Sequence, residues 1–148
     1  MRFGLFGGAA RGRTDDRNTY QEFIDMCVGS EGLGYTGVFL VEHHFTGFGQ
    51  ASSPLSMLNY LAAKTTNFRL GTAVTVVAWR NPVLLAEEAA TLDLLSGGRL
   101  DLGVGKGYRF NEFRGMGVSM DEASERLEES VGGSPLGMAE RGPLGLRR

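Results

Sequence analysis

Cysteine is nearly absent from this sequence. Cys27 is the single cysteine among 148 residues, so no disulfide bond can form within one chain. Residues 1–8, MRFGLFGG, reach arginine and glycine too soon to hold the apolar core of a secretion signal. No apolar run approaches the roughly 20 residues of a membrane-spanning helix. Together these absences predict a cytoplasmic protein without a membrane span.

The chain also lacks an excess of basic residues. It has 15 Lys and Arg against 17 Asp and Glu, which gives a formal net charge of -2. Because a nonspecific nucleic-acid binder needs a basic face, we expect no nucleic-acid partner. Hydrophobic residues make up 42% of the chain, and this length and composition predict a globular domain with its own core.

Histidine is scarce as well: His43 and His44 are the only two, and they directly follow Glu42. A metal site is not expected, because the chain has no His-Glu-x-x-His pattern and no further Cys or His to complete a ligand set. The glycine-rich residues 103–109, GVGKGYR, fail the spacing of both a P-loop and a dinucleotide fingerprint. None of these motifs therefore explains the two histidines.

What the sequence does contain is a regular alternation of strand and helix patterns. Apolar and β-branched runs predict buried strands at residues 2–7, 36–44, 68–77 and 99–105. Capping residues and helix-initiating prolines predict helices that begin near Thr19, Pro54, Pro82 and Ser119. Four such βα units predict an α/β fold with a parallel sheet over residues 1–131. Residues 132–148 have frequent Gly and Pro without periodicity, which predicts a disordered tail.

Residues with useful chemistry follow the ends of the expected strands, where parallel α/β sheets bind ligands. Histidine exchanges protons near neutral pH, cations hold anionic groups, and aromatic side chains contact ring systems. This pattern predicts a cofactor or substrate site but leaves its chemistry open. The alternatives are a structural role for the histidines, solvated loop cations and a core position for the aromatics. The candidates are Phe6, Glu42, His43, His44, Trp79, Lys106 and Arg109.

Several stretches, in the same order, resemble the bacterial luciferase-like family of flavin-dependent monooxygenases. The most specific are GYTGVFLVEHHFTGFG at 34–49 and NPVLLAEEAATLDLLSGGRLDLGVGKGYR at 81–109. MRFGLF at 1–6 and LGTAV at 70–74 match as well, and the resemblance extends to about residue 130. It implies a (β/α)8 TIM barrel, of which this chain supplies about four βα units and hence a partial barrel.

The resemblance also implies a chemistry. Reduced FMN, supplied by a separate flavin reductase, would activate oxygen as a flavin hydroperoxide that attacks a small organic substrate. His43 would act as acid/base or stabilise the peroxide, and Lys106 would face the flavin phosphate. Ala73 and Val74 would form a non-prolyl cis peptide under the flavin ring. At the position that matches the reactive cysteine of luciferase, this sequence has Gly105, so cysteine chemistry is not expected.

The remaining candidates take supporting roles in this hypothesis. Phe6 and Arg109 are predicted to contact the cofactor. Glu42 and His44 are predicted to position His43 without contacting the cofactor themselves. A deazaflavin-dependent oxidoreductase and a catalytically inactive fragment are the alternatives. Half of the barrel units are missing, so we expect a truncated chain whose open sheet edges favour a homo-oligomer.

Overall fold

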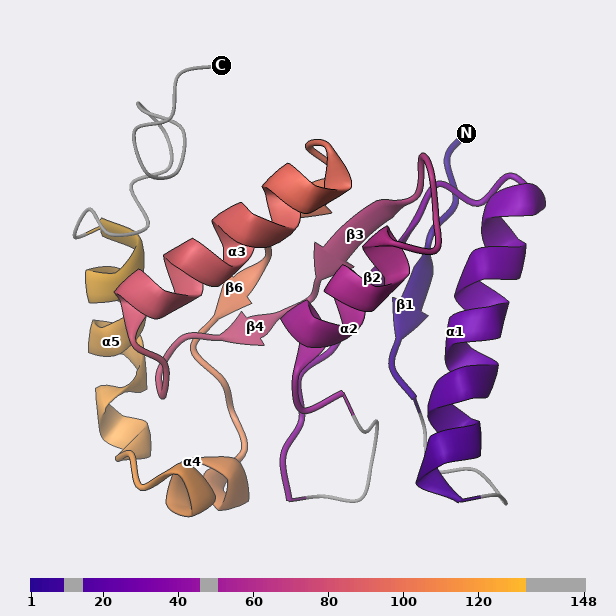
Figure 1. Ribbon diagram of the computed structural model, residues 1–148. Coiled ribbons are helices and arrows are strands. Elements are labelled where there is room, and N and C mark those ends of the chain that lie inside the picture. The colour runs from indigo at the N-terminus through magenta and orange to yellow at the C-terminus, as the bar shows by residue number, and fades with distance from the viewer. Residues whose placement is uncertain (10–14, 46–50, 133–148) are drawn as a thin grey trace.

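Parallel strands alternate with helices in the computed structural model, which describes residues 1–9, 15–45 and 51–132 (Figure 1). One four-stranded sheet has the order β1-β2-β3-β5, with every neighbouring pair parallel. A parallel pair, β4-β6, extends beyond it. The predicted parallel α/β fold is confirmed. The strands are β1 (Leu5–Gly7), β2 (Gly37–Leu40), β3 (Arg69–Thr72), β4 (Thr75–Val76), β5 (Leu100–Asp101) and β6 (Val104–Gly105).

The helices cover one face of the four-stranded sheet. Figure 1 shows α2 and α3 in front of the strands, with α1 beside β1 and with α4 and α5 beyond β4 and β6. The apolar sides of α2 and α3 supply fully buried leucines to the core. The helices are α1 (Asp16–Gly32), α2 (Pro54–Ala62), α3 (Pro82–Ser96), α4 (Phe110–Met116) and α5 (Ala123–Gly132), with a 3-10 turn, η1 (Met120–Glu122), before the last.

The two faces of the sheet differ sharply in burial. Side chains alternate along a strand, so Val38 and Leu40 point to the helices, and both are completely buried. Phe39 lies between them in β2 and points to the opposite face, with its register partners Phe6 in β1 and Gly71 in β3. A Cβ atom at Gly71 would overlap the ring of Phe39, so glycine makes room for that ring. Phe6 is 73% exposed, so no layer of described residues covers this second face over β1.

The strands are shorter than the sequence predicts. β1 ends at Gly7, whose carbonyl accepts the last hydrogen bond on that side from the Val41 N–H at 3.0 Å. Residues 42–44 therefore leave the sheet, and the prediction of a strand that extends to residue 44 is wrong. The single strand predicted for 68–77 is also wrong, because it is divided into β3 and β4 at the Ala73–Val74 peptide. The strand predicted for 99–105 is likewise two short strands, β5 and β6.

Helix starts are predicted correctly where proline marks them. Pro54 and Pro82 begin α2 and α3, and the side chain of Asn81 accepts hydrogen bonds from two N–H groups at the start of α3. The prediction that Thr19 caps the first helix is wrong. Asp15 caps α1 by accepting from the Asn18 N–H at 2.9 Å, so Thr19 lies inside the helix. Asp is as common a helix cap as Thr, so Asp15 was an equally good candidate in the sequence.

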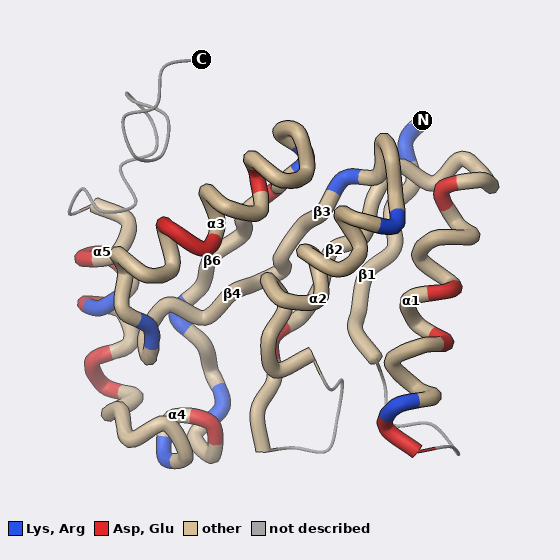
Figure 2. The backbone as a smooth tube through the Cα atoms, in the orientation of Figure 1, with Lys and Arg blue, Asp and Glu red and all other residues tan. Residues whose placement is uncertain are grey.

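The end of the chain follows the prediction in part. Ser119 does act as a cap, but for η1, through the Asp121 N–H, and α5 begins at Ala123. The predicted tail, residues 132–148, lies outside the described residues except for Gly132, which ends α5. Figure 2 shows acidic residues along α1 and α5, with the basic residues of the described chain dispersed among several elements. None of the described helices is long and apolar enough to cross a membrane.

Cys27 provides a simple test of the core. Its side chain is fully buried on the sheet-facing side of α1, and this burial raises the pKa of its thiol to about 11. At pH 8 the thiolate, which is the reactive form, should therefore be rare. We expect a thiol reagent to label Cys27 at least about 100-fold more slowly in the folded protein than in urea. Equal labelling rates in both conditions would contradict this packing of α1.

Candidate functional site

A cavity of about 570 Å³ opens where the strands end. Its size falls within the range of small-molecule and cofactor pockets. Phe6 of β1 and the segments that follow β2, β3 and β6 contribute to it, which is the position expected for a parallel α/β sheet. Most of the predicted site residues meet here. Those that line the cavity are Phe6, Glu42, His43, Ala73, Val74 and Lys106.

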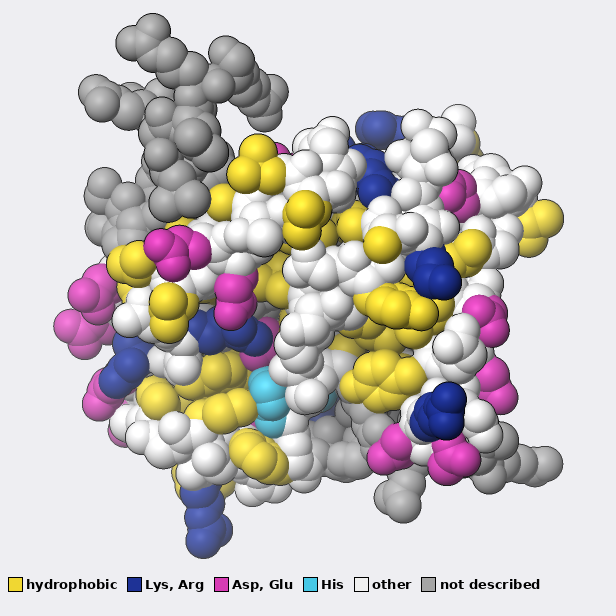
Figure 3. Space-filling model, in the orientation of Figure 1, with side chains coloured by type: hydrophobic (Ala, Val, Ile, Leu, Met, Phe, Trp, Pro, Cys, Tyr) yellow, Lys and Arg dark blue, Asp and Glu magenta, His cyan; other side chains and the backbone are white. Residues whose placement is uncertain are grey.

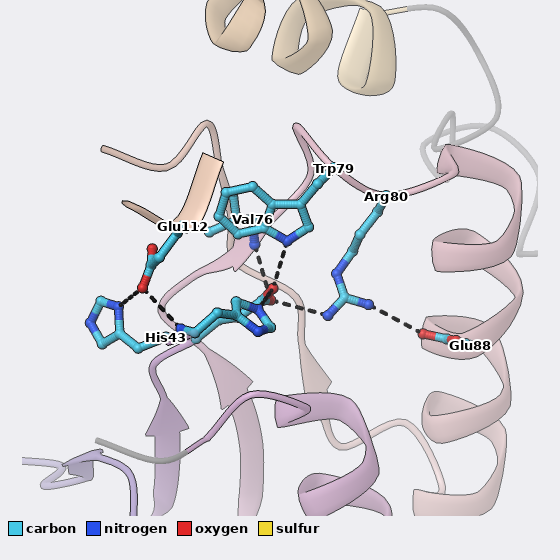
Figure 4. A network of polar contacts seen from close by, with 8 residues as sticks. His43, Val76, Trp79, Arg80, Glu88 and Glu112 are labelled. Carbon is cyan, nitrogen blue, oxygen red and sulfur yellow. Dashed lines mark hydrogen bonds and ion pairs between the residues drawn. The ribbon is translucent and has the colours of Figure 1, made fainter. Parts of the chain in front are cut away.

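The buried carboxylate of Glu42 bonds several parts of this region at once, and Figure 4 labels three of its partners, Val76, Trp79 and Arg80. Glu42 is 3% exposed. Its Oε1 lies 2.9 Å from His44 Nε2 and accepts from Trp79 Nε1 at 3.1 Å. Its Oε2 accepts from the Val76 N–H and from the Arg80 guanidinium, both at 3.2 Å. One side chain after β2 is therefore bonded to β4 and to the loop before α3.

Arg80 gives this carboxylate its opposite charge. The guanidinium also lies 3.7 Å from the carboxylate of Glu88 on α3, so it joins the buried Glu42 to an exposed one (Figure 4). A buried charge is stable only when it is paired and hydrogen-bonded. The Glu42 carboxylate meets both conditions.

A second buried carboxylate holds the other histidine. Glu112, in the first turn of α4, is 2% exposed. Its Oε1 lies 3.1 Å from His43 Nδ1 and accepts from the His44 backbone N–H at 2.9 Å (Figure 4). Glu112 is not among the residues predicted from the sequence. The Phe110 and Phe113 spacing and the following Gly117 could have indicated a short helix, but nothing marks Glu112 as the partner of a histidine 69 residues away.

Aromatic packing places α4 against the site. Phe113 is 1% exposed, and its ring contacts Trp79 edge to face with centroids 5.2 Å apart. Trp79 in turn meets the His44 ring at 5.6 Å. Trp79 does not belong to the cavity lining, which favours the core alternative for this residue. In Figure 3 histidine side chains, in cyan, are visible in a recess between apolar side chains.

The predicted cations differ in their placement. Lys106 lines the cavity, is exposed, and donates a hydrogen bond to Ser124 Oγ at 3.2 Å. Arg109 lies outside the cavity lining, next to the ring of Tyr108 with its guanidinium 5.5 Å from the centroid. Its contact with a cofactor stays a prediction. His44 is likewise outside the lining and bonds Glu42, which is the geometry of a supporting residue.

The backbone beneath the cavity has the features that the resemblance implies. The Ala73–Val74 peptide is cis, as predicted. Gly105 lies beside it, and a Cβ atom there would come within 2.6 Å of Val74 Cγ2. Real Cβ atoms avoid such a distance, so a cysteine at this position would require Val74 to move. Glycine at position 105 thus leaves room for the Val74 side chain beside the cis peptide.

Comparisons with known proteins agree with this geometry. A sequence model of the luciferase-like monooxygenases matches residues 1–132. The chain belongs to the luciferase-like monooxygenase family. It is 36% identical over 137 residues to the oxygenase component of the flavin-dependent trigonelline monooxygenase of Acinetobacter baylyi. That match covers 88% of this chain and 38% of the relative.

Solved structures show a similar fold. The monooxygenase RslO1 of Streptomyces bottropensis superposes with a TM-score of 0.87 at 32% identity, over 95% of this chain and 44% of that protein. The oxygenating constituent of a 3,6-diketocamphane monooxygenase of Pseudomonas putida, in complex with FMN, has a TM-score of 0.82 at 21% identity, over 88% and 37% of the two chains. An F420-dependent secondary alcohol dehydrogenase has a TM-score of 0.74 at 21% identity, over 93% and 41%. This chain therefore spans less than half the length of these proteins, and only part of the barrel fold is present.

The Glu42 network gives a stability prediction. Glu42→Gln removes the charge opposite Arg80 and replaces one acceptor oxygen with an amide donor that faces other donors. We expect a loss of about 3 kcal/mol in the free energy of unfolding, measured by urea denaturation. The matched control is Glu122→Gln, which breaks an exposed ion pair with Arg126 and should cost less than about 1 kcal/mol. Equal losses in the two variants would contradict the central role of Glu42.

Proposed function

We propose that this chain forms the flavin-facing half of a monooxygenase site that uses reduced FMN and oxygen to oxidise a small organic substrate. The observation that supports this most strongly is the cavity at the strand ends, lined by His43 and by the Ala73–Val74 segment. The 36% identity to a flavin-dependent monooxygenase component supports the same chemistry.

The chemistry of the cavity lining fits such a cofactor. Apolar groups from Phe6, Val41, Val74 and Val76 provide contact for a flat ring system. Lys106 adds a positive charge at the cavity, where an anionic phosphate tail would gain a charge-assisted hydrogen bond. The lining thus combines apolar side chains with charged and polar ones, as expected for a site that orients a mainly apolar ring.

His43 is the residue that we propose moves a proton. Its ring lines the cavity, is 16% exposed, and has Nδ1 engaged by Glu112. Its Nε2 bonds no other described residue, so that nitrogen is available to a ligand. Bound reduced flavin would supply two electrons, so that one atom of oxygen enters the substrate and the other leaves as water. His43 would supply or accept the proton that this reaction needs at the substrate or oxygen.

A deazaflavin-dependent oxidoreductase is the second candidate. It is supported by the F420-dependent alcohol dehydrogenase, whose fold superposes on this chain. The sequence identity favours the flavin, because the flavin-dependent relative is 36% identical and the F420-dependent protein 21%. The two candidates differ in an observable way, since only the monooxygenase consumes oxygen.

The partners follow from the same proposal. The trigonelline enzyme is described as an oxygenase component, which supports a separate reductase that delivers reduced flavin.

Exposed apolar side chains on α3, among them Leu94 at 60% and Leu95 at 72%, together with the open edge at β1, support self-association into a homo-oligomer. We place the protein in the cytoplasm, where a reductase could supply reduced flavin.

Titration of the chain with FMN tests the cofactor assignment. Trp79 is the single tryptophan and lies beside Glu42, so its fluorescence should report binding in the cavity. We expect a micromolar Kd that rises about tenfold in Lys106→Ala, because one charge-assisted hydrogen bond to the phosphate is lost.

Lys64→Ala is the matched control. Lys64 is exposed near Tyr60 at the end of α2, outside the cavity lining, and its removal should leave the Kd unchanged. Equal effects of the two lysine variants would contradict the phosphate assignment. Tighter binding of a deazaflavin than of FMN would favour the second candidate.

A further inference from the structure

The two adjacent histidines are held through opposite ring nitrogens. His43 uses Nδ1 toward Glu112, at 3.1 Å, whereas His44 uses Nε2 toward Glu42, at 2.9 Å. Only His43 belongs to the cavity lining. A neutral imidazole carries its proton on one nitrogen, and the hydrogen bond of one nitrogen decides the state of the other. The two buried carboxylates therefore give the two rings different roles.

The contacts of Glu112 indicate which nitrogen of His43 carries the proton. Oε1 of Glu112 accepts the His44 backbone N–H at 2.9 Å, and a backbone N–H can only donate. The same oxygen faces His43 Nδ1. An ionised Glu112 accepts hydrogen bonds from both the His44 backbone N–H and His43 if Nδ1 carries a hydrogen. Glu112 is 2% exposed, so bulk water does not compete for this oxygen.

We propose that Glu112 is a positioning residue that fixes His43 in the Nδ1–H tautomer, so that the neutral ring presents an unprotonated Nε2 to the cavity. The role of that Nε2 rests on the proposed function. A proton that leaves the ligand bonds to the Nε2 lone pair, which leaves the electron pair on the ligand. The resulting imidazolium is paired with the Glu112 carboxylate, which does not itself take the proton.

The place of Glu112 in the fold suits this task. Its contact with the His44 backbone fixes the carboxylate relative to the segment that carries His43. Phe113, the next residue on α4, is buried against Trp79, so the helix that carries Glu112 is held by the same cluster. The carboxylate and the imidazole are therefore anchored to each other and not merely close together.

The tautomer can be measured directly, without flavin and without turnover. The full chain has two histidines, so 15N labelling of histidine gives two ring systems, which a His44→Asn variant assigns. Spectra recorded at about pH 8 report which ring nitrogen of a neutral imidazole carries the hydrogen. We expect His43 to show a protonated, pyrrole-like Nδ1 and an unprotonated, pyridine-like Nε2.

Two substitutions at Glu112 separate positioning from general structure. Glu112→Leu removes the acceptor, so His43 should lose the Nδ1–H pattern. Glu112→Gln keeps an acceptor oxygen for both donors and should retain it. The His44 ring is the internal control, because its partner Glu42 is untouched and its signals should stay in place in both variants.

Each outcome decides the proposal. A wild-type His43 that carries its hydrogen on Nε2, or a Leu variant whose His43 tautomer is unchanged, would overturn it. Loss of both histidine patterns in the Leu variant would show that Glu112 only holds the segment together, and would also overturn it. Failure of FMN to bind would contradict the proposed function but would leave the tautomer result standing, so the two failures are distinguishable.

Discussion

The buried carboxylate of Glu42 is the constraint on which the rest of the site depends. Its two oxygens are bonded to the His44 ring, the Val76 backbone, the Trp79 indole and the Arg80 guanidinium. Because residues 42–44 have left the sheet, no strand hydrogen bonds fix them. The side-chain contacts of Glu42 replace those bonds and hold the segment that carries His43 against β4 and the loop before α3. Glu112 then contacts the same segment from the other side, through His43 and the His44 backbone.

This arrangement explains why so polar a cluster lies next to an apolar core. Fully buried carboxylates are costly unless every lone pair has a donor and a positive charge is close. Glu42 has both, and Glu112 has two donors. The result is a histidine whose surroundings are ordered before any ligand binds, which is what acid/base chemistry on a bound substrate requires. The apolar residues of the cavity provide contact area for a ligand, and the two carboxylates orient the histidine segment.

Much of this could be predicted from the sequence, for reasons that differ between residues. The alternation of strands and helices and the Asn81-Pro82 start of α3 depend on residues close together in the sequence. Such local patterns are confirmed in the structure. The positions of His43 and Lys106 followed from strand ends and from the family resemblance. The breaks at Ala73–Val74 and between β5 and β6 could not be read from β-propensity, since β-branched residues continue across the first of them. The Glu112 contact could not be predicted either, because it joins residues 69 positions apart and no local pattern encodes such a pairing.

This chain supplies only part of the barrel. This chain spans 38% of the trigonelline monooxygenase component and 44% of RslO1, and its sheet keeps one face open at Phe6. The residues that we assign to flavin and proton transfer nevertheless line one cavity at the ends of the strands that are present. A site of this kind could form wherever the open face and edges are covered.

A crystal structure of this chain grown with FMN would test the central claim most directly. The account predicts the flavin ring against the Ala73–Val74 peptide, its phosphate at Lys106, and His43 facing the ring with its Glu112 contact intact. A flavin bound elsewhere, or a His43 turned away from Glu112 when flavin is present, would contradict it.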